Sequence, residues 1–153
     1  ARAAGRDLEV RFTHALELMR ARKLDAAAIA VEGMLAIFPY HAGALCLRGN
    51  LLCAQGRFDQ ALRDFQRAAR EDPADAAHWI GAARALERLE RPQEAIACYE
   101  RALQAAPALP DIAARLADLT KRNVKSSATT NSSSVRNARS PPASIRRYGR
   151  FAR

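Results

Sequence analysis

Three prolines recur at a fixed interval along the chain. Pro39, Pro73 and Pro107 are each separated by 34 residues. A constant period of this length is typical of repeat architectures, in which one supersecondary unit stacks on the next and the stack buries a continuous core. Aligned on the prolines, the sequence divides into a first repeat over 8–41, a second over 42–75 and a third over 76–109.

The second and third repeats agree in residue type at seven equivalent positions. These positions are Leu45, Gly49, Leu52, Ala61, Phe65, Ala68 and Pro73 in the second repeat, and Trp79, Ala83, Leu86, Ala95, Tyr99, Ala102 and Pro107 in the third. Within each half of a repeat the apolar residues are spaced so that they fall on one face of a helix. Each repeat therefore predicts a pair of antiparallel helices.

The small and aromatic residues of the second repeat predict how this pair packs. Gly56 is expected to end the first helix in a left-handed conformation, and Pro73 to stop the second. Gly49 and Ala61 are small where the two helices approach each other closely. The aromatic ring of Phe65 is expected to fill the space beside them, and its counterparts in the third repeat predict the same arrangement.

On these residues the chain resembles the tetratricopeptide repeat (TPR) family over roughly 8–109. The resemblance implies an all-α fold, a right-handed superhelix of stacked antiparallel helix pairs. Residues 110–122 resemble the solvating helix that caps such arrays, which gives a TPR domain over 8–122. The first repeat departs from the pattern at Arg11, Arg22 and Met34, although its helices are still expected to form.

The resemblance also implies a binding surface. The first helix of each repeat lines the concave face of the superhelix, and in the family this groove holds an extended or helical segment of a partner polypeptide. We predict a groove whose first half is apolar and whose last helix is charged, which suits a partner with an apolar anchor and an acidic group. The predicted groove residues are Phe12, Leu16, Met19, Leu47, Asn50, Ile80, Arg84 and Arg88.

One branch of the family grips a C-terminal carboxylate with a clamp of Lys, Asn and Arg side chains. Only Asn50 and Arg84 resemble that clamp here, whereas Phe12 and Leu16 stand where the first repeat would carry Lys and Asn. We therefore expect no recognition of chaperone C-termini. Asn50 is either a hydrogen-bonding partner for an extended peptide or a solvated side chain on a helix face.

No pattern for catalysis, a cofactor or a metal ion is found in the repeats. Residues 1–125 contain no serine, and neither a Gly-rich phosphate loop nor a metalloprotease motif occurs. His14, His41 and His78 belong to different repeats, so no metal site is expected from them. The sequence predicts a protein that is not an enzyme.

The three cysteines are odd in number and lack the spacing of zinc or redox sites. Cys46 and Cys53 are seven residues apart on one predicted helix and are able to line the groove together, although small apolar filler is the commoner role. We expect reduced thiols and a cytoplasmic protein. No stretch is long and apolar enough for a membrane span.

Positive charge is confined to the end of the chain. The formal net charge is +9, yet Lys+Arg and Asp+Glu are balanced up to Thr120, and 121–153 hold nine basic residues and no acidic one. Residues 123–153 are rich in Ser, Thr, Asn, Pro and Arg, so we expect a disordered basic tail. Nucleic acid or an anionic surface is a possible partner of this tail only, where Arg alternates with aromatic residues near 145–151.

The sequence favours an adaptor or scaffold that binds a partner polypeptide in the concave groove. Two alternatives remain open. The repeats are either the recognition module of a larger bacterial enzyme of the glycosyltransferase or sulfotransferase type, or a chaperone of the type III secretion kind. Both alternatives use the same repeat fold and differ in what accompanies it.

Overall fold

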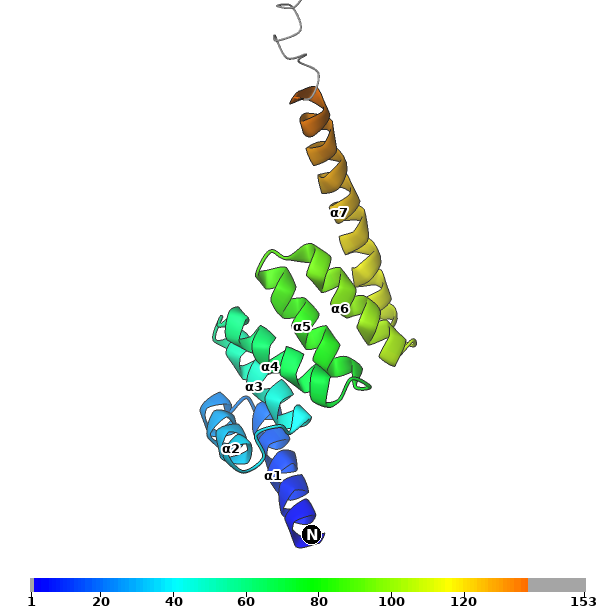
Figure 1. Cartoon of the computed structure of the whole chain (residues 1–153). Coiled ribbons are helices and arrows are strands. Elements are labelled where there is room, and N and C mark those ends of the chain that lie inside the picture. The colour runs from blue at the N-terminus through cyan, green and yellow to red at the C-terminus, as the bar shows by residue number, and fades with distance from the viewer. Residues whose placement is uncertain (1, 138–153) are drawn as a thin grey trace, which may run out of the picture.

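The computed structural model describes the backbone of residues 2–137 and the side chains of residues 2–126. Within these residues all regular secondary structure is helical, and short turns join the helices (Figure 1). The helices are α1 (Arg2–Arg20), α2 (Leu24–Ile37), α3 (Ala42–Ala54), α4 (Phe58–Glu71), α5 (Ala76–Arg88), α6 (Pro92–Ala105) and α7 (Pro110–Asn137). The prediction of an all-α repeat fold is confirmed.

The helices pack as a stack of antiparallel pairs. Each helix contacts the next one along the chain, and α3 also contacts both α1 and α5. The first helices of the three repeats, α1, α3 and α5, therefore lie side by side in one layer, and α2, α4 and α6 pack against this layer. This is the arrangement that the resemblance implied, and it leaves one face of the stack lined by first helices.

The turn within each repeat closes in the same way three times. Gly56 adopts a left-handed φ of 76°, and the equivalent Arg22 and Glu90 adopt φ values of 60° and 58°. Behind Gly56, the Arg57 N–H donates to the Leu52 carbonyl at 2.9 Å, and matching bonds close the other two turns. The conformation expected at Gly56 is confirmed. Because Arg22 and Glu90 carry a Cβ, the same turn is strained in the first and third repeats.

The ring of Phe65 lies between the first helices of two neighbouring repeats. A Cβ placed on Gly49 would lie 2.8 Å from the ring, and one placed on Gly81 would lie 2.4 Å from it. Phe65 itself is only 1% exposed. Real Cβ atoms do not make contacts this short, so α3 and α5 can approach the ring only because both residues are glycine.

Two of the first helices begin with side-chain caps. The Ala44 N–H donates to His41 Nδ1 at 3.0 Å at the start of α3, and the Ala77 N–H donates to Asp75 Oδ1 at 2.9 Å at the start of α5. Asp is a common cap, whereas His is an unusual one whose acceptor nitrogen is available only while the ring is neutral. Burial lowers the pKa of His41 below its ordinary value, which favours the neutral ring.

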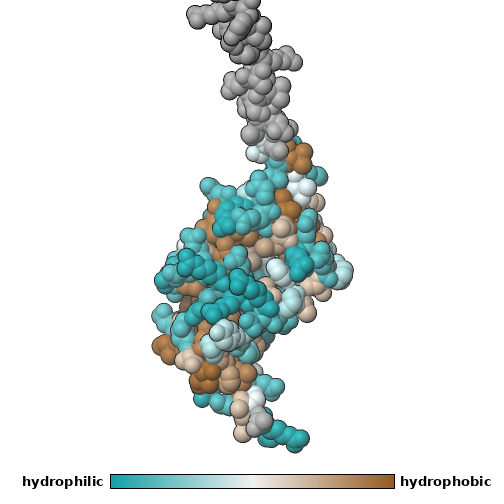
Figure 2. All heavy atoms as spheres, viewed as in Figure 1, coloured by the Kyte–Doolittle hydropathy of each residue, from teal (hydrophilic) through white to brown (hydrophobic). Residues whose placement is uncertain are grey.

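Two hydrophobic clusters run through the stack. The larger one extends from Ala15 of α1 to Ala95 of α6, and the smaller one joins Ala83, Tyr99, Ile112 and Leu119 across α5, α6 and α7. The solvating helix thus buries its apolar stripe against the third repeat as predicted. Figure 2 shows hydrophilic side chains over most of one face, with hydrophobic ones gathered near the end formed by α1 and α2.

Trp79 differs from the sequence-based expectation. Its position in the repeat predicts a core residue, but the side chain is half-buried. Its indole N–H donates to the Pro73 carbonyl at 3.0 Å, and the Arg101 guanidinium lies over the ring at 5.0 Å from its centroid. An indole needs a partner for its N–H, and Trp79 meets this need at the edge of the stack.

Both ends of the array extend beyond the predicted boundaries. Helix α1 begins at Arg2 instead of residue 8, and α7 continues from the expected end at 122 to Asn137. The assignment of 123–137 to a disordered tail is therefore corrected. These residues contain neither Pro nor Gly, and extending an anchored helix is far easier than starting one. The remaining basic residues, 138–153, lie outside the described part of the chain.

None of the helices within residues 2–137 combines the length and the apolar character that crossing a bilayer requires.

The turn geometry predicts opposite effects of glycine at equivalent positions. We expect Arg22→Gly and Glu90→Gly each to raise the free energy of unfolding by about 0.5–1 kcal/mol, because glycine relieves the left-handed strain. Gly56→Ala should lower it by a similar amount. Urea unfolding followed by circular dichroism measures all three variants, and destabilisation by both glycine substitutions would contradict the strain argument.

The seat of Phe65 predicts that one added methyl group disturbs the stack. We expect Gly81→Ala to lower the free energy of unfolding by about 2 kcal/mol, since the methyl group overlaps a buried ring. Phe65→Leu in the same chain should restore part of the loss. Gly33→Ala is the matched control, because nothing lies within 4 Å of a Cβ there and alanine favours the helix. Equal effects of the Gly81 and Gly33 substitutions would contradict the close packing of the Phe65 ring against Gly81.

The cap at His41 predicts a contribution to stability that depends on pH. Because the folded chain holds the His41 pKa below its ordinary value of 6.5, the unfolded chain binds more protons at this position in that window. The contribution is complete above pH 6.5 and is lost as the pH falls through the folded pKa. His41→Asn retains an acceptor without titrating, so this variant should lose less stability than the wild type between pH 7.5 and 5 in urea unfolding. Equal losses in the two proteins would show that His41 does not carry the pH dependence.

Candidate groove site

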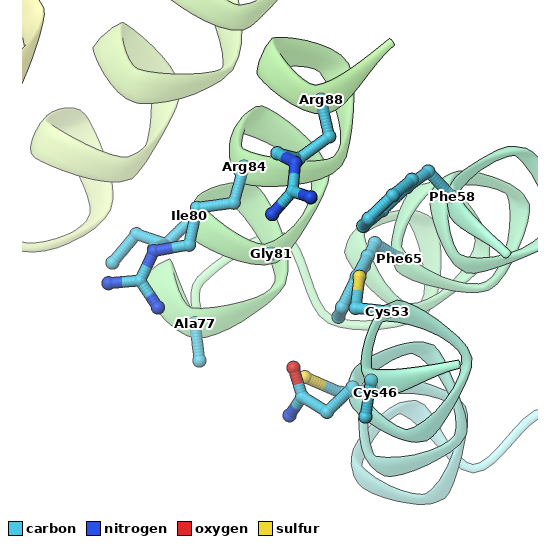
Figure 3. Close-up of a pocket in the computed structure, with 11 residues that line it drawn as sticks. Cys46, Cys53, Phe58, Phe65, Ala77, Ile80, Gly81, Arg84 and Arg88 are labelled. Carbon is cyan, nitrogen blue, oxygen red and sulfur yellow. The ribbon is translucent and has the colours of Figure 1, made fainter. Parts of the chain in front are cut away.

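An open pocket lies between α3 and α5 on the face lined by first helices. Its volume is about 570 Å³. Figure 3 shows Cys46, Cys53, Phe58 and Phe65 on one side of the pocket and Ala77, Ile80, Arg84 and Arg88 on the other. The full lining is Cys46, Asn50, Cys53, Ala54, Phe58, Phe65, Ala77, Ile80, Gly81, Arg84 and Arg88.

The floor of this pocket is apolar because of the same small residues that seat Phe65. The buried Phe65 ring reaches the lining of the pocket beside Gly81, and Ala54 and Ala77, which also line it, have only short side chains. Ile80 of α5 is half-buried and adds an aliphatic wall. The floor therefore accepts an apolar side chain from a partner.

The rim of the pocket is positively charged. Arg84 and Arg88 are four residues apart on α5 and are both exposed, and neither guanidinium has a carboxylate partner within the described side chains. Arg88 lies over the Phe58 ring at 4.7 Å from its centroid. This contact between cation and ring restricts the Arg88 side chain to the edge of the pocket. The exposed Asn50 amide faces the same space from α3.

The two thiols of the pocket are held in their neutral form. Burial, together with the charge of Asp75, raises the pKa of Cys46 to about 11. Burial also raises the pKa of Cys53, against the smaller opposing effect of the Arg88 charge. A neutral thiol is a poor nucleophile and a poor metal ligand. Both cysteines therefore act as small apolar parts of the wall, which is the commoner role of such residues.

A second pocket of about 440 Å³ adjoins the first across Arg84 and Arg88, which line both. On its far side, Glu87 accepts a hydrogen bond from the Tyr99 hydroxyl at 2.6 Å and two from the Arg115 guanidinium of α7. Burial raises the pKa of Glu87, but these hydrogen bonds outweigh it and hold the pKa below its usual range. Burial and the bond to Glu87 raise the pKa of Tyr99 to about 12.

This network fixes the end of α5 against the solvating helix. Since Glu87 is fully engaged with Tyr99 and Arg115, it leaves the neighbouring Arg84 and Arg88 uncompensated. The negative charge of Glu87 and the positive charges of Arg84 and Arg88 thus face different neighbours on the same helix. This explains how the helical repeats, whose charges balance overall, carry a positively charged pocket rim.

The structure brings four of the eight predicted groove residues together. Asn50, Ile80, Arg84 and Arg88 all line the pocket between α3 and α5. Leu47 is only 6% exposed and belongs to the core, so its prediction as an accessible groove residue is wrong. On α3, Leu47 precedes Asn50 by nearly one turn and points into the stack.

The three predicted residues of the first repeat do not line this pocket. Leu16 and Met19 are half-buried and pack against the larger hydrophobic cluster. The Phe12 ring lies against Gly43 and stacks on His41 with 5.3 Å between the ring centroids. Because α1 packs on the start of α3 through these side chains, the apolar first half of the predicted groove is used within the protein itself.

Phe58 is the lining residue that sequence reasoning missed. It is the first residue of α4, a second helix of its repeat, whereas the predicted groove was drawn from first helices only. Its place directly after the Gly56 turn brings it round to the mouth of the pocket. The sequence feature that could have indicated Phe58 as a lining residue is its position two residues after Gly56.

Among the described residues, those that line the groove pocket form no cluster of three potential metal ligands. The one cluster of three potential metal ligands within the described residues consists of Asp72, Asp75 and His78, at the junction of α4 and α5. None of these residues lines the pocket.

Comparison with known proteins agrees with this geometry. Residues 46–110 match the model of the tetratricopeptide repeat family. No curated protein matches the chain by sequence.

Solved structures with the same fold are numerous. The first TPR of Spaghetti (RPAP3) bound to an HSP90 peptide is 18% identical, with a TM-score of 0.71, and the match covers 76% of this chain and 93% of that one. PcrH in complex with the chaperone-binding region of PopD is 21% identical, with a TM-score of 0.71 and coverage of 78% and 95%. A Thermobaculum terrenum O-GlcNAc transferase mutant is 24% identical, with a TM-score of 0.71, and covers 78% of this chain but only 23% of the enzyme.

The stack of antiparallel helix pairs agrees with the fold of these solved structures. Residues 46–110 therefore carry the sequence pattern of the tetratricopeptide repeat family, and the stacked helix pairs of this chain have the fold of solved tetratricopeptide repeat domains.

Proposed function

We propose that this protein is an adaptor that binds a polypeptide segment in the pocket between α3 and α5. The observation that carries the proposal is a pair of arginines, Arg84 and Arg88, without carboxylate partners among the described side chains, at the rim of an open apolar pocket. Burying an apolar side chain supplies affinity, and an acidic group beside the arginines supplies orientation and selectivity. The partner segment therefore carries an apolar anchor next to an acidic group.

The comparisons support binding of a polypeptide by a protein of this fold. The RPAP3 domain holds an HSP90 peptide and PcrH holds a region of PopD, as their descriptions state. Those two ligands differ from each other, so they support the class of partner and not its identity. Asn50 and Arg84 alone do not make a complete carboxylate clamp, and the acidic group that we propose is a side chain.

The proposed role is non-catalytic and intracellular. The thiols of the groove are neutral, and all three cysteines are unpaired, which agrees with a reducing compartment. The two alternatives from the sequence, a recognition module of a larger enzyme and a secretion chaperone, use the same groove. The T. terrenum enzyme and PcrH have the corresponding fold, but no feature of the pocket favours either alternative.

Selection from a phage-displayed peptide library on the immobilised full chain tests the proposal. The wild type should enrich peptides with an acidic residue near an apolar one. The variant Arg84→Glu/Arg88→Glu should bind these peptides at least about tenfold more weakly, because each lost charge contact contributes on the order of 1 kcal/mol. Binding should also weaken with added salt, because the arginines are exposed.

The matched control reverses two exposed arginines that line none of the described pockets. Arg67→Glu/Arg101→Glu changes the net charge by the same amount at sites where the guanidinium groups lie over Tyr40 and Trp79. This control should retain full binding, and circular dichroism should show both variants folded. Enriched peptides without acidic residues, or equal losses in the two variants, would overturn the groove assignment.

A further inference from the structure

The side chains of Asp72, Asp75 and His78 meet where the second repeat joins the third. Asp72 is the C-cap of α4, Asp75 is the N-cap of α5, and His78 lies in the first turn of α5. One potential ligand atom from each residue lies within 4.8 Å of the other two. None of the three residues takes part in the groove site.

His78 is the residue that core packing does not explain. It is only 3% exposed, and its Nδ1 is buried without a hydrogen-bond partner. Its Nε2 faces Asp75 Oδ2 at 3.7 Å, which is too long for a hydrogen bond. Buried polar groups are nearly always satisfied, yet this ring makes no hydrogen bond, and its Nε2 faces a carboxylate oxygen at a distance that leaves room for a ligand between the two atoms.

The two aspartates are already oriented by the backbone. Asp75 accepts the Ala77 N–H through Oδ1, and Asp72 accepts the Ala74 N–H through Oδ1 at 3.3 Å. Each carboxylate therefore keeps its Oδ2 for another partner. Carboxylates that bind metal ions are commonly oriented by hydrogen bonds of this kind. One oxygen accepts a backbone N–H, and the other oxygen is left to face the ion.

The other two repeat junctions carry no such set of residues. The positions equivalent to Asp72, Asp75 and His78 are Phe38, His41 and Ala44 at the preceding junction, and Ala106, Leu109 and Ile112 at the following one. The repeat fold thus requires neither a carboxylate pair nor a buried imidazole at this place. Their coincidence at one junction is specific to this chain.

We propose that Asp72, Asp75 and His78 bind a divalent transition-metal ion, with Zn²⁺ as the best match to one nitrogen and two oxygen ligands. Two ligands on a tetrahedral Zn²⁺ lie about 3.4 Å apart, since each bond is about 2.1 Å long. The 3.7 Å between His78 Nε2 and Asp75 Oδ2 is close to that distance. A ligand oxygen of the exposed Asp72 already lies within 4.8 Å of the other two ligand atoms, so a small movement of this side chain completes the set. Water completes the coordination.

Such an ion joins the end of α4 to the start of α5. It neutralises the two carboxylates, gives Nε2 of the buried His78 ring a partner and fixes the junction next to Ala77, which lines the groove pocket. Because a metal that binds only the folded chain stabilises it, thermal stability should rise when the ion is added.

Titration of the full chain with Zn²⁺ by calorimetry, and with Co²⁺ by absorption spectroscopy, tests the site. The wild type should bind one ion and show the visible band of cobalt with mixed nitrogen and oxygen ligands. His78→Ala, which introduces the residue of the preceding repeat, and Asp72→Asn should each weaken binding at least about tenfold. Asp75→Asn should weaken binding as much while keeping the helix cap, because Asn caps a helix as well as Asp does.

His14→Ala is the control, because its exposed ring lies outside the cluster, and it should bind as the wild type does. Absence of binding by the wild type, or undiminished binding by His78→Ala and Asp72→Asn, would overturn the proposal. Asp72→Asn replaces an exposed side chain and keeps the fold, so that variant decides the matter even where His78→Ala is destabilised. A cobalt charge-transfer band from thiolate would assign the ion to a cysteine and would also refute the site.

Discussion

The ring of Phe65, seated between Gly49 and Gly81, sets the distance between two neighbouring repeats. A ring of this size fills the space that side chains on both first helices would otherwise occupy, and it is almost completely buried. The spacing of α3 and α5 is therefore fixed by the Phe65 ring and by the lack of a side chain at Gly49 and Gly81. Packing of this kind tolerates little change, because a well-packed interior has no free volume for even one methyl group.

The groove site follows from the same contact. The buried Phe65 ring belongs to the pocket lining beside Gly81, so the residue that spaces the repeats is also part of the floor on which we propose that an apolar side chain rests. The positive rim has a separate origin in α5. Glu87 is bound to Tyr99 and Arg115, whereas the guanidinium groups of Arg84 and Arg88 lie at the open side of the pocket. Shape and charge of the pocket are thus set by different contacts and can be altered independently.

Much of the fold could be predicted from the sequence, because the 34-residue period is visible in the spacing of the prolines and of the small and aromatic residues. The helix pairs, the left-handed turn at Gly56 and the solvating helix all followed from spacing and residue size. The predictions were weaker where a contact depends on neighbours. Trp79 reaches the Pro73 carbonyl at the edge of the stack, and α7 continues to Asn137 because no helix breaker follows its anchored first turns. Of the predicted groove residues, Asn50, Ile80, Arg84 and Arg88 line the pocket between α3 and α5, and Phe58 lines it without having been predicted.

The sequence by itself determined the repeat, the all-α architecture and the neutrality of the body. These properties are set by the order and size of residues along the chain, which a period of 34 displays directly. Only the tertiary structure decided which face each side chain presents once the repeats are stacked. Leu47 turned into the core, Phe12 was used to hold α1 on α3, and Asp72, Asp75 and His78 came together at one junction. Contacts between residues of different helices depend on the angle and distance between those helices. Packing across repeats sets this angle and distance, and no local sequence pattern does.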